Sequence, residues 1–224
     1  MWPDNHGPFS LGVSTTANVP QATYFQEVSI VTNDIIHPGD IAYVVPESGE
    51  ANRLREGAGL DKPIIPGGGI PLGRPMLIIS GPTEVPGLDS KGAFMVNWWY
   101  VEALCKDGVR RQGYTAERNP KERSDVFLKP YRDCQDGGKR LLKTTLSHNS
   151  QAKVVSDHVN IRPQPNTVKG AIGTHLEGAM FKVYGYPRCD DQGRIWWSMT
   201  ESRSVPGRWV CEVDKDDVRY LKPV

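Results

Sequence analysis

The side chains best suited to bind a ligand are the tryptophans of two Trp-Trp pairs, Trp98-Trp99 and Trp196-Trp197. Because successive residues of a β-strand point to opposite faces, each pair places one indole on either face of its strand. Trp99 shares its face with aliphatic residues and Trp197 shares its face with Met199, so these two are expected in a core. Trp98 and Trp196 are then expected to be exposed, where a flat aromatic ring can stack on a ligand. The alternative is that another part of the chain covers them.

Two tyrosines are further candidates for ligand binding. Tyr100 lies on the same strand face as Trp98. Tyr184 and Tyr186 flank Gly185 at the end of a predicted strand, so one of them should border a groove while the other packs. Tyr100 and Tyr186 therefore join the candidate binding residues.

Residue patterns typical of enzymes are missing from the sequence. Cys105 lies inside a strand-like run with no helical signal after it, unlike the nucleophile of a papain-like peptidase. The five His residues include none at i, i+4 spacing, and the glycine run 67–69 lacks the Lys-Ser/Thr of a phosphate-binding loop. The acidic pairs Asp190-Asp191 and Asp216-Asp217 are adjacent, as in solvated turns. We expect no enzymatic activity, no metal and no cofactor.

Composition favours short elements. The 224 residues include 23 Gly and 18 Pro, an excess over the roughly 12% that these two types average together. With 24% charged and 38% hydrophobic residues, this favours short strands joined by turns over a helical bundle. The net charge of +1 provides no field that would hold a polyanion, so nucleic acid is not an expected partner.

The sequence also bears on location and on cysteine chemistry. The N-terminal residues show no secretory signal, and the most apolar stretch, residues 76–79, is far too short to span a bilayer. We expect a soluble chain without a transmembrane segment, in an unspecified compartment. The cysteines at positions 105, 134, 189 and 211 form no Cys-x-x-Cys pair, which favours mostly buried or free thiols over a disulfide framework.

An internal repeat organises most of the chain, because five landmarks recur in one order. In the first half these are Asn52–Gly59, Pro71–Gly81, Trp98-Trp99, Gly113–Thr115 and Leu128–Pro130, and in the second half they are Val159–Asn166, His175–Gly185, Trp196-Trp197, Gly207–Val210 and Leu221–Pro223. We predict an N-terminal arm (1–37), a first copy (38–130), a linker (131–151) and a second copy (152–224). The arm is rich in Pro, Gly and Asn, with one predicted strand at 26–31. Each copy contains short strands punctuated by Gly and Pro, which predicts small all-β barrels.

The second copy carries Val159-Asn160-Ile161-Arg162, Ile172-Gly173, Leu176 with Gly178, a Trp-Trp strand and Arg208-Trp209-Val210. This order resembles the bacterial type of Src-homology-3 (SH3) domain over nearly all of the copy. The first copy departs from the pattern, because Arg53 replaces the usual Asn, Tyr114-Thr115 replaces Trp-Val and the loops are longer.

The resemblance implies a barrel of five to seven strands and a non-catalytic targeting module. Such modules often occur in tandem beside cell-wall hydrolases and hold peptidoglycan peptides in a shallow groove. Arg55 and Arg162 match the family arginine. An arginine there can donate to backbone carbonyls and hold a turn, or it can bind a ligand carboxylate.

The sequence thus predicts an all-β chain of two small SH3-like β-barrels in tandem, with an irregular N-terminal arm. Two functions stay open. In the first, the protein is a non-catalytic binding or scaffold protein that recognises a peptide or peptidoglycan-type ligand through shallow aromatic grooves; the candidate residues are Trp98, Tyr100, Arg162, Tyr186 and Trp196. In the second, it is a structural or accessory subunit of a multi-subunit complex, and its arm and linker contact neighbouring chains.

Overall fold

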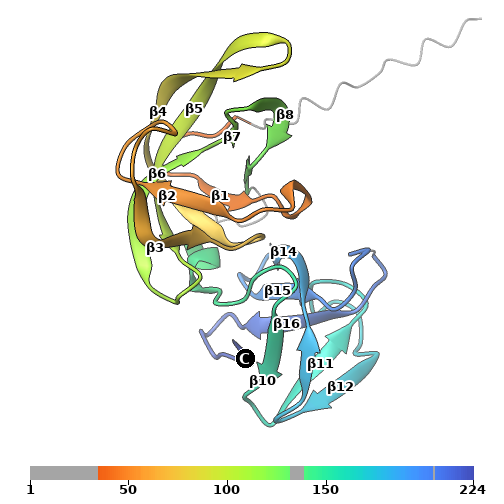
Figure 1. Cartoon of the computed structure of the whole chain (residues 1–224). Coiled ribbons are helices and arrows are strands. Elements are labelled where there is room, and N and C mark those ends of the chain that lie inside the picture. The colour runs from red at the N-terminus through yellow and green to blue at the C-terminus, as the bar shows by residue number, and fades with distance from the viewer. Residues whose placement is uncertain (1–34, 132–138, 204) are drawn as a thin grey trace, which may run out of the picture. The chain divides into compact units, whose positions relative to one another are not determined.

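The structure is a computed structural model that describes residues 35–131, 139–203 and 205–224, and the regular secondary structure of these residues is almost entirely antiparallel β-strand (Figure 1). Within the described ranges the helical segments are two short 3-10 helices, η1 (Pro46–Ser48) and η2 (Lys139–Lys143). The all-β fold class is therefore confirmed. The strand predicted at 26–31 lies outside the described residues. No helix of the described ranges is long and apolar enough to cross a membrane.

We call residues 35–131 the first half. Its strands are β1 (Ile41–Val44), β2 (Asn52–Arg55), β3 (Ile64–Ile70), β4 (Pro75–Asp89), β5 (Gly92–Leu104), β6 (Arg110–Ala116), β7 (Arg118–Asn119), β8 (Glu122–Val126) and β9 (Leu128–Pro130). Seven of them form one sheet in the order β3-β2-β6-β5-β4-β1-β9, and β7 pairs with β8. Figure 1 shows the paired ends of β4 and β5 extending past the other strands of this half.

We call residues 139–224 the second half. Its strands are β10 (Gln151–Val154), β11 (His158–Arg162), β12 (Gly173–Leu176), β13 (Met180–Lys182), β14 (Tyr184–Cys189), β15 (Ile195–Ser198), β16 (Trp209–Val213) and β17 (Leu221–Pro223). They form a three-stranded sheet, β13-β10-β17, and a five-stranded sheet, β12-β11-β16-β15-β14. That the two halves are SH3-like barrels stays a prediction.

The two halves have the same strand order and the same register. The order β3-β2-β6-β5-β4-β1-β9 becomes that of the second half if β4 is broken into the consecutive strands β13 and β14. Ala42 in β1 lies opposite Met76 and Pro130, and Ala152 in β10 lies opposite Phe181 and Pro223. The Leu-Lys-Pro segment that ends each copy of the sequence repeat is therefore the same edge strand in both halves.

Each half has its own apolar core, and a third cluster contains residues from both halves. The first-half core includes Leu54, Met76, Ile78, Trp99 and Val101, and the second-half core includes Leu146, Val154, Ile161, Trp197 and Leu221. The third, which we call the shared cluster, consists of Ile41, Tyr43, Val45, Tyr131, Leu141, Ile195 and Val213. Leu141 belongs to η2, so the predicted linker contributes buried side chains to the fold.

Candidate functional site

The two Trp-Trp pairs divide their side chains between two faces, as strand alternation predicts. Trp99 and Trp197 lie in the main cores of the two halves. The indole N–H of Trp99 donates to a carboxylate oxygen of Glu117 at 2.9 Å, and that of Trp197 donates to Glu212 at 2.8 Å. These two Trp–Glu hydrogen bonds occupy equivalent places. Glu117 directly follows Ala116, which lies opposite Trp98, and Glu212 directly follows Cys211, which lies opposite Trp196.

The expectation that Trp98 and Trp196 are exposed is wrong, since each residue is only 2% exposed. Trp98 packs in a second apolar cluster beside Ala116, and Trp196 packs beside Trp209 and Cys211. Alternation fixes the face on which a side chain lies, but it does not reveal what covers that face. Here neighbouring strands bring their own apolar residues to it. Trp209 is buried as well, at 1% exposure.

A cavity of about 290 Å³ in the second half lies over the cluster of Trp196, Trp209 and Cys211. Its lining includes the buried residues Val159, Trp196 and Cys211. Arg162 and Lys215 contribute charged side chains to the same cavity. Two of the predicted binding residues, Arg162 and Trp196, therefore lie together.

Asp190 does not line this second-half pocket itself, but it holds two residues that do, Trp196 and Arg194. Its carboxylate accepts the indole N–H of Trp196 at 3.0 Å and pairs with the Arg194 guanidinium at 3.1 Å. Asp190 is only 7% exposed, so its interpretation as part of a solvated turn is wrong. Sequence analysis missed Arg194 as a pocket residue and Asp190 as its partner, because the sequence does not show which side chains these two residues contact.

Two ionisable groups that line the second-half pocket, the Cys211 thiol and the Tyr220 hydroxyl, have raised pKa values. Burial raises the pKa of the Cys211 thiol well above its ordinary value. A thiol held protonated in this way is a poor nucleophile. Burial also raises the pKa of the Tyr220 hydroxyl, which donates to Asp214 at 3.1 Å.

A second cavity, of about 470 Å³, lies in the first half. Trp98 and Ala116 supply buried lining, while Arg53, Arg55 and Lys121 supply charge. The buried indole nitrogen of Trp98 has no hydrogen-bond partner among the residues that the structure describes, in contrast to that of Trp196. This first-half pocket adjoins a further hollow of about 750 Å³, which Trp98 and Lys121 also line.

The two pockets are built from equivalent strand positions. Trp98 lies opposite Ala116 in the β5–β6 pairing, and Trp196 lies opposite Cys211 in the β15–β16 pairing. All four of these residues line their respective pockets.

Two further positions in each half show the same equivalence between the pockets. Arg55 lies opposite Tyr114 and Arg162 lies opposite Trp209. Phe127 and Tyr220 each precede a terminal Leu-Lys-Pro strand, and each lines its pocket. The sequence repeat thus produces one pocket in each half.

Arg55 and Arg162 hold turns in the same manner. The Arg55 guanidinium donates to the backbone carbonyl of Lys62 at 2.6 Å, and that of Arg162 donates to the carbonyl of Lys169 at 2.6 Å. In both halves the acceptor is seven residues further along the chain. The turn-holding role is therefore present in each copy, and both arginines also line a pocket.

The two predicted tyrosines lie elsewhere. Tyr100 packs against Tyr114, with ring centroids 5.1 Å apart, and Tyr114 in turn packs against the cluster of Trp98. Tyr186 packs against Tyr43, with centroids 4.3 Å apart, at the shared cluster. Neither lines the two pockets. Tyr184 is the member of its pair that borders a cavity.

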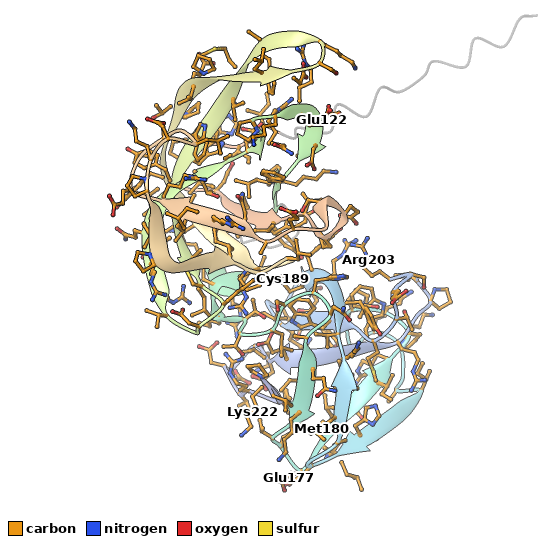
Figure 2. All side chains as sticks on the ribbon, in the orientation of Figure 1. Glu122, Glu177, Met180, Cys189, Arg203 and Lys222 are labelled. Atoms are coloured by element: carbon orange, nitrogen blue, oxygen red, sulfur yellow. The ribbon has the colours of Figure 1, made fainter. Side chains whose placement is uncertain are left out.

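The cysteines differ in state. Cys105 and Cys211 are buried free thiols, and Cys189 is disulfide-bonded. Figure 2 labels Cys189. It also labels Arg203, whose guanidinium pairs with Glu47 of the first half at 2.8 Å. Within the described ranges no group of three or more His, Cys, Asp or Glu side chains could hold a metal ion.

Comparisons with known proteins give little more. No family model matches the chain, and no curated protein matches it. Two solved structures that resemble it are the crystal structure of Ly7917 and that of Ly7917 with the hydrolyzing product of MDP, at 20% and 19% sequence identity. Each comparison covers 66% of this chain and 66% of the other, with a TM-score of 0.27. A likeness this low carries no argument about fold or function.

Proposed function

We propose that the protein is a non-catalytic binding protein whose two equivalent pockets hold short acidic peptide segments, such as the peptide part of peptidoglycan. The observation that carries this proposal is that one pocket design occurs twice. In each half a buried tryptophan and a turn-holding arginine line a cavity at equivalent strand positions.

The charge of the pockets supports an acidic ligand. Three cationic side chains, Arg53, Arg55 and Lys121, line the first-half pocket, where Glu50 is the acidic lining residue. In the second half, Arg162, Arg194 and Lys215 line the pocket with Asp214. Each pocket therefore has an excess of positive charge that attracts carboxylates, next to an apolar surface suited to a peptide backbone or side chain.

The chemistry inside the second-half pocket supports binding without catalysis. The Cys211 thiol has a raised pKa, and its Sγ contacts the carbonyl of Val213 at 3.3 Å. The carboxylate of Asp190 is occupied by Trp196 and Arg194. These groups hold the pocket together, and neither is arranged as a nucleophile with a general base.

Co-sedimentation with purified peptidoglycan sacculi tests this proposal. Arg53→Glu and Lys215→Glu each reverse one charge at an exposed edge of one pocket. Each variant should lower the bound fraction, and the double variant should abolish binding. Lys129→Glu and Lys222→Glu are matched controls, since these exposed lysines lie opposite Tyr43 and Lys153 on edge strands outside both pockets (Figure 2 labels Lys222). If the wild-type protein does not bind sacculi or soluble peptidoglycan fragments, or if the double variant binds equally well, the proposal fails.

A role as an accessory subunit is the second candidate, and the tip of the β4–β5 hairpin favours it. Pro86 lies opposite Met95 and Leu88 lies opposite Ala93, so all four share one face. Leu88 is 69% exposed and Met95 is 52% exposed. An exposed apolar face of this kind is typical of protein contacts. Co-purification of a specific partner that is lost in Leu88→Ser and retained in Lys91→Ser would support this role.

A further inference from the structure

A third cavity, of about 710 Å³, is lined by residues of both halves and shares only Ala51 with the twin pockets. From the first half it takes the turn between β3 and β4 and the end of β5, including Arg74 and Lys106. From the second half it takes residues near 145–150, including Ser147 and His148. No acidic side chain is among its lining residues.

Arg74 is a buried cation in this cavity, at 6% exposure. Its guanidinium donates to the backbone carbonyl of Thr145 at 2.8 Å and to that of Leu104 at 3.4 Å. The buried Nε has no partner among the residues that the structure describes. Backbone carbonyls are neutral, so these hydrogen bonds leave the positive charge of Arg74 without a direct counter-ion.

The nearest acidic group serves another arginine. Glu212 attracts Arg74 electrostatically, but its carboxylate pairs directly with Arg219 at 2.7 Å. Burial lowers the pKa of Arg74 to about 10, against the opposing attraction of Glu212. The guanidinium stays charged at neutral pH and is only partly compensated.

Other donors line the same cavity. Nδ1 of His148 accepts the backbone N–H of Gly185 at 2.8 Å, so a neutral ring carries its proton on Nε2. Burial, together with the charge of Arg203, lowers the pKa of His148, which keeps the ring neutral above that pKa. Lys106 adds a second positive charge to the lining.

We propose that this cavity binds a small ligand through an oxyanion, a carboxylate or a phosphate, with Arg74 and Lys106 as its cationic partners. An anion there would supply the missing counter-charge in a cavity that offers positive charge and no carboxylate. The volume lies within the range of small-molecule sites, roughly 300–1,000 Å³, so the oxyanion is one end of a larger ligand. This site does not depend on the function proposed for the twin pockets.

Thermal unfolding of the full chain with citrate, with inorganic phosphate and with chloride at matched ionic strength tests this proposal. Binding to the folded state raises Tm with a saturable dependence on concentration. We expect this rise with citrate or phosphate and not with chloride, and the comparison of the two identifies the preferred oxyanion. Lys106→Gln, at an exposed position, should weaken the apparent affinity about tenfold, as expected for the loss of one ion pair of about 1.4 kcal/mol.

Four variants make the result specific. Arg74→Gln should remove the saturable rise, and Lys106→Gln decides the matter alone if Arg74→Gln does not fold. Lys91→Gln removes an exposed lysine outside this cavity and should behave like wild type. The twin-pocket variant Arg53→Glu should keep the full anion effect. Equal stabilisation by chloride, or unchanged citrate and phosphate affinity in Lys106→Gln, would overturn the proposal.

Discussion

The indole nitrogens of the paired tryptophans have different environments. Trp99, Trp196 and Trp197 each donate to a carboxylate, whereas the Trp98 nitrogen has no partner within the described part of the chain. A buried donor without a partner costs free energy, typically about 1–3 kcal/mol. Of the two pockets, the first-half pocket is therefore the one whose tryptophan has an unpaired buried N–H donor. A ligand bound there could supply the acceptor for Trp98.

Trp196→Ala should strongly destabilise the protein. The side chain is buried beside Trp209 and Cys211, so its removal leaves a cavity and takes away one of the hydrogen bonds of Asp190. We expect a loss of about 3–5 kcal/mol in the free energy of unfolding, measured by urea denaturation. Trp196→Phe retains most of the volume and should lose less. A loss below about 1 kcal/mol for Trp196→Ala would show that the side chain is not packed as described.

Glu212→Gln should cost more stability than Glu117→Gln. Glu212 is fully buried and accepts from Trp197, Thr144 and the backbone N–H of Thr145, in addition to its ion pair with Arg219. Loss of that charge leaves Arg219 without its partner, and we expect about 2–4 kcal/mol by urea denaturation. Glu117→Gln, at the equivalent and less buried position, should cost about 1 kcal/mol. Equal losses would contradict the difference in burial.

At the scale of elements, strand alternation and the repeat predicted a large part of what is observed. The faces of Trp98 and Trp99 follow from strand alternation, and the turn-holding role was one of the two roles considered for Arg55 and Arg162. The covering of Trp98 could not be predicted, because it depends on which strands meet over it. The two-residue strand β7 and its partner β8 likewise left no recognisable signal in the sequence.

The β3–β4 turn contacts the second half at Gly73, and Gly73→Ala should disrupt that contact. Gly73 has φ of +70°, and an added Cβ would lie 2.1 Å from the carbonyl oxygen of Gly185. Gly39 has φ of +90° with nothing within 4 Å of such a Cβ. Gly39→Ala thus measures backbone strain alone, about 1 kcal/mol. Gly73→Ala should lower Tm clearly further, and equal Tm values for the two variants would contradict the close approach.

The tip of the β4–β5 hairpin is tied to β8 by an ion pair that should make stability depend on pH. The Arg123 guanidinium pairs with Asp89 at 2.7 Å and lowers the pKa of that carboxyl from its ordinary value of 3.8. Because the folded pKa is the lower one, the pair contributes its full stability above about pH 4, and this is lost as the pH falls toward the folded value. In urea titrations between pH 6 and pH 2, Asp89→Asn should show a shallower acid decline than wild type. An unchanged decline would exclude this pair as a cause.

At the scale of the whole molecule, residues 139–151 of the segment predicted as a linker are part of the packed structure. Leu141 of η2 is fully buried in the shared cluster, and Leu146 is fully buried in the second-half core. Thr144 and Thr145 donate to Glu212. The Asp-Gly-Gly and Ser/Asn-rich ends of this segment predicted a linker. The sequence does not show that the two repeats pack against one stretch of chain. The repeat itself, which was visible in the sequence, underlies the twin pockets.

The most direct test of the twin-pocket account is a titration with soluble peptidoglycan fragments, followed by the NMR signals of the tryptophan indole N–H groups. Trp98 and Trp196 line the two pockets, whereas Trp99 and Trp197 lie in the main cores and serve as controls within the same molecule. The account predicts saturable shifts of the Trp98 and Trp196 signals, with little change for Trp99 and Trp197. Unmoved Trp98 and Trp196 signals at saturating fragment, or equal movement of all four, would contradict it.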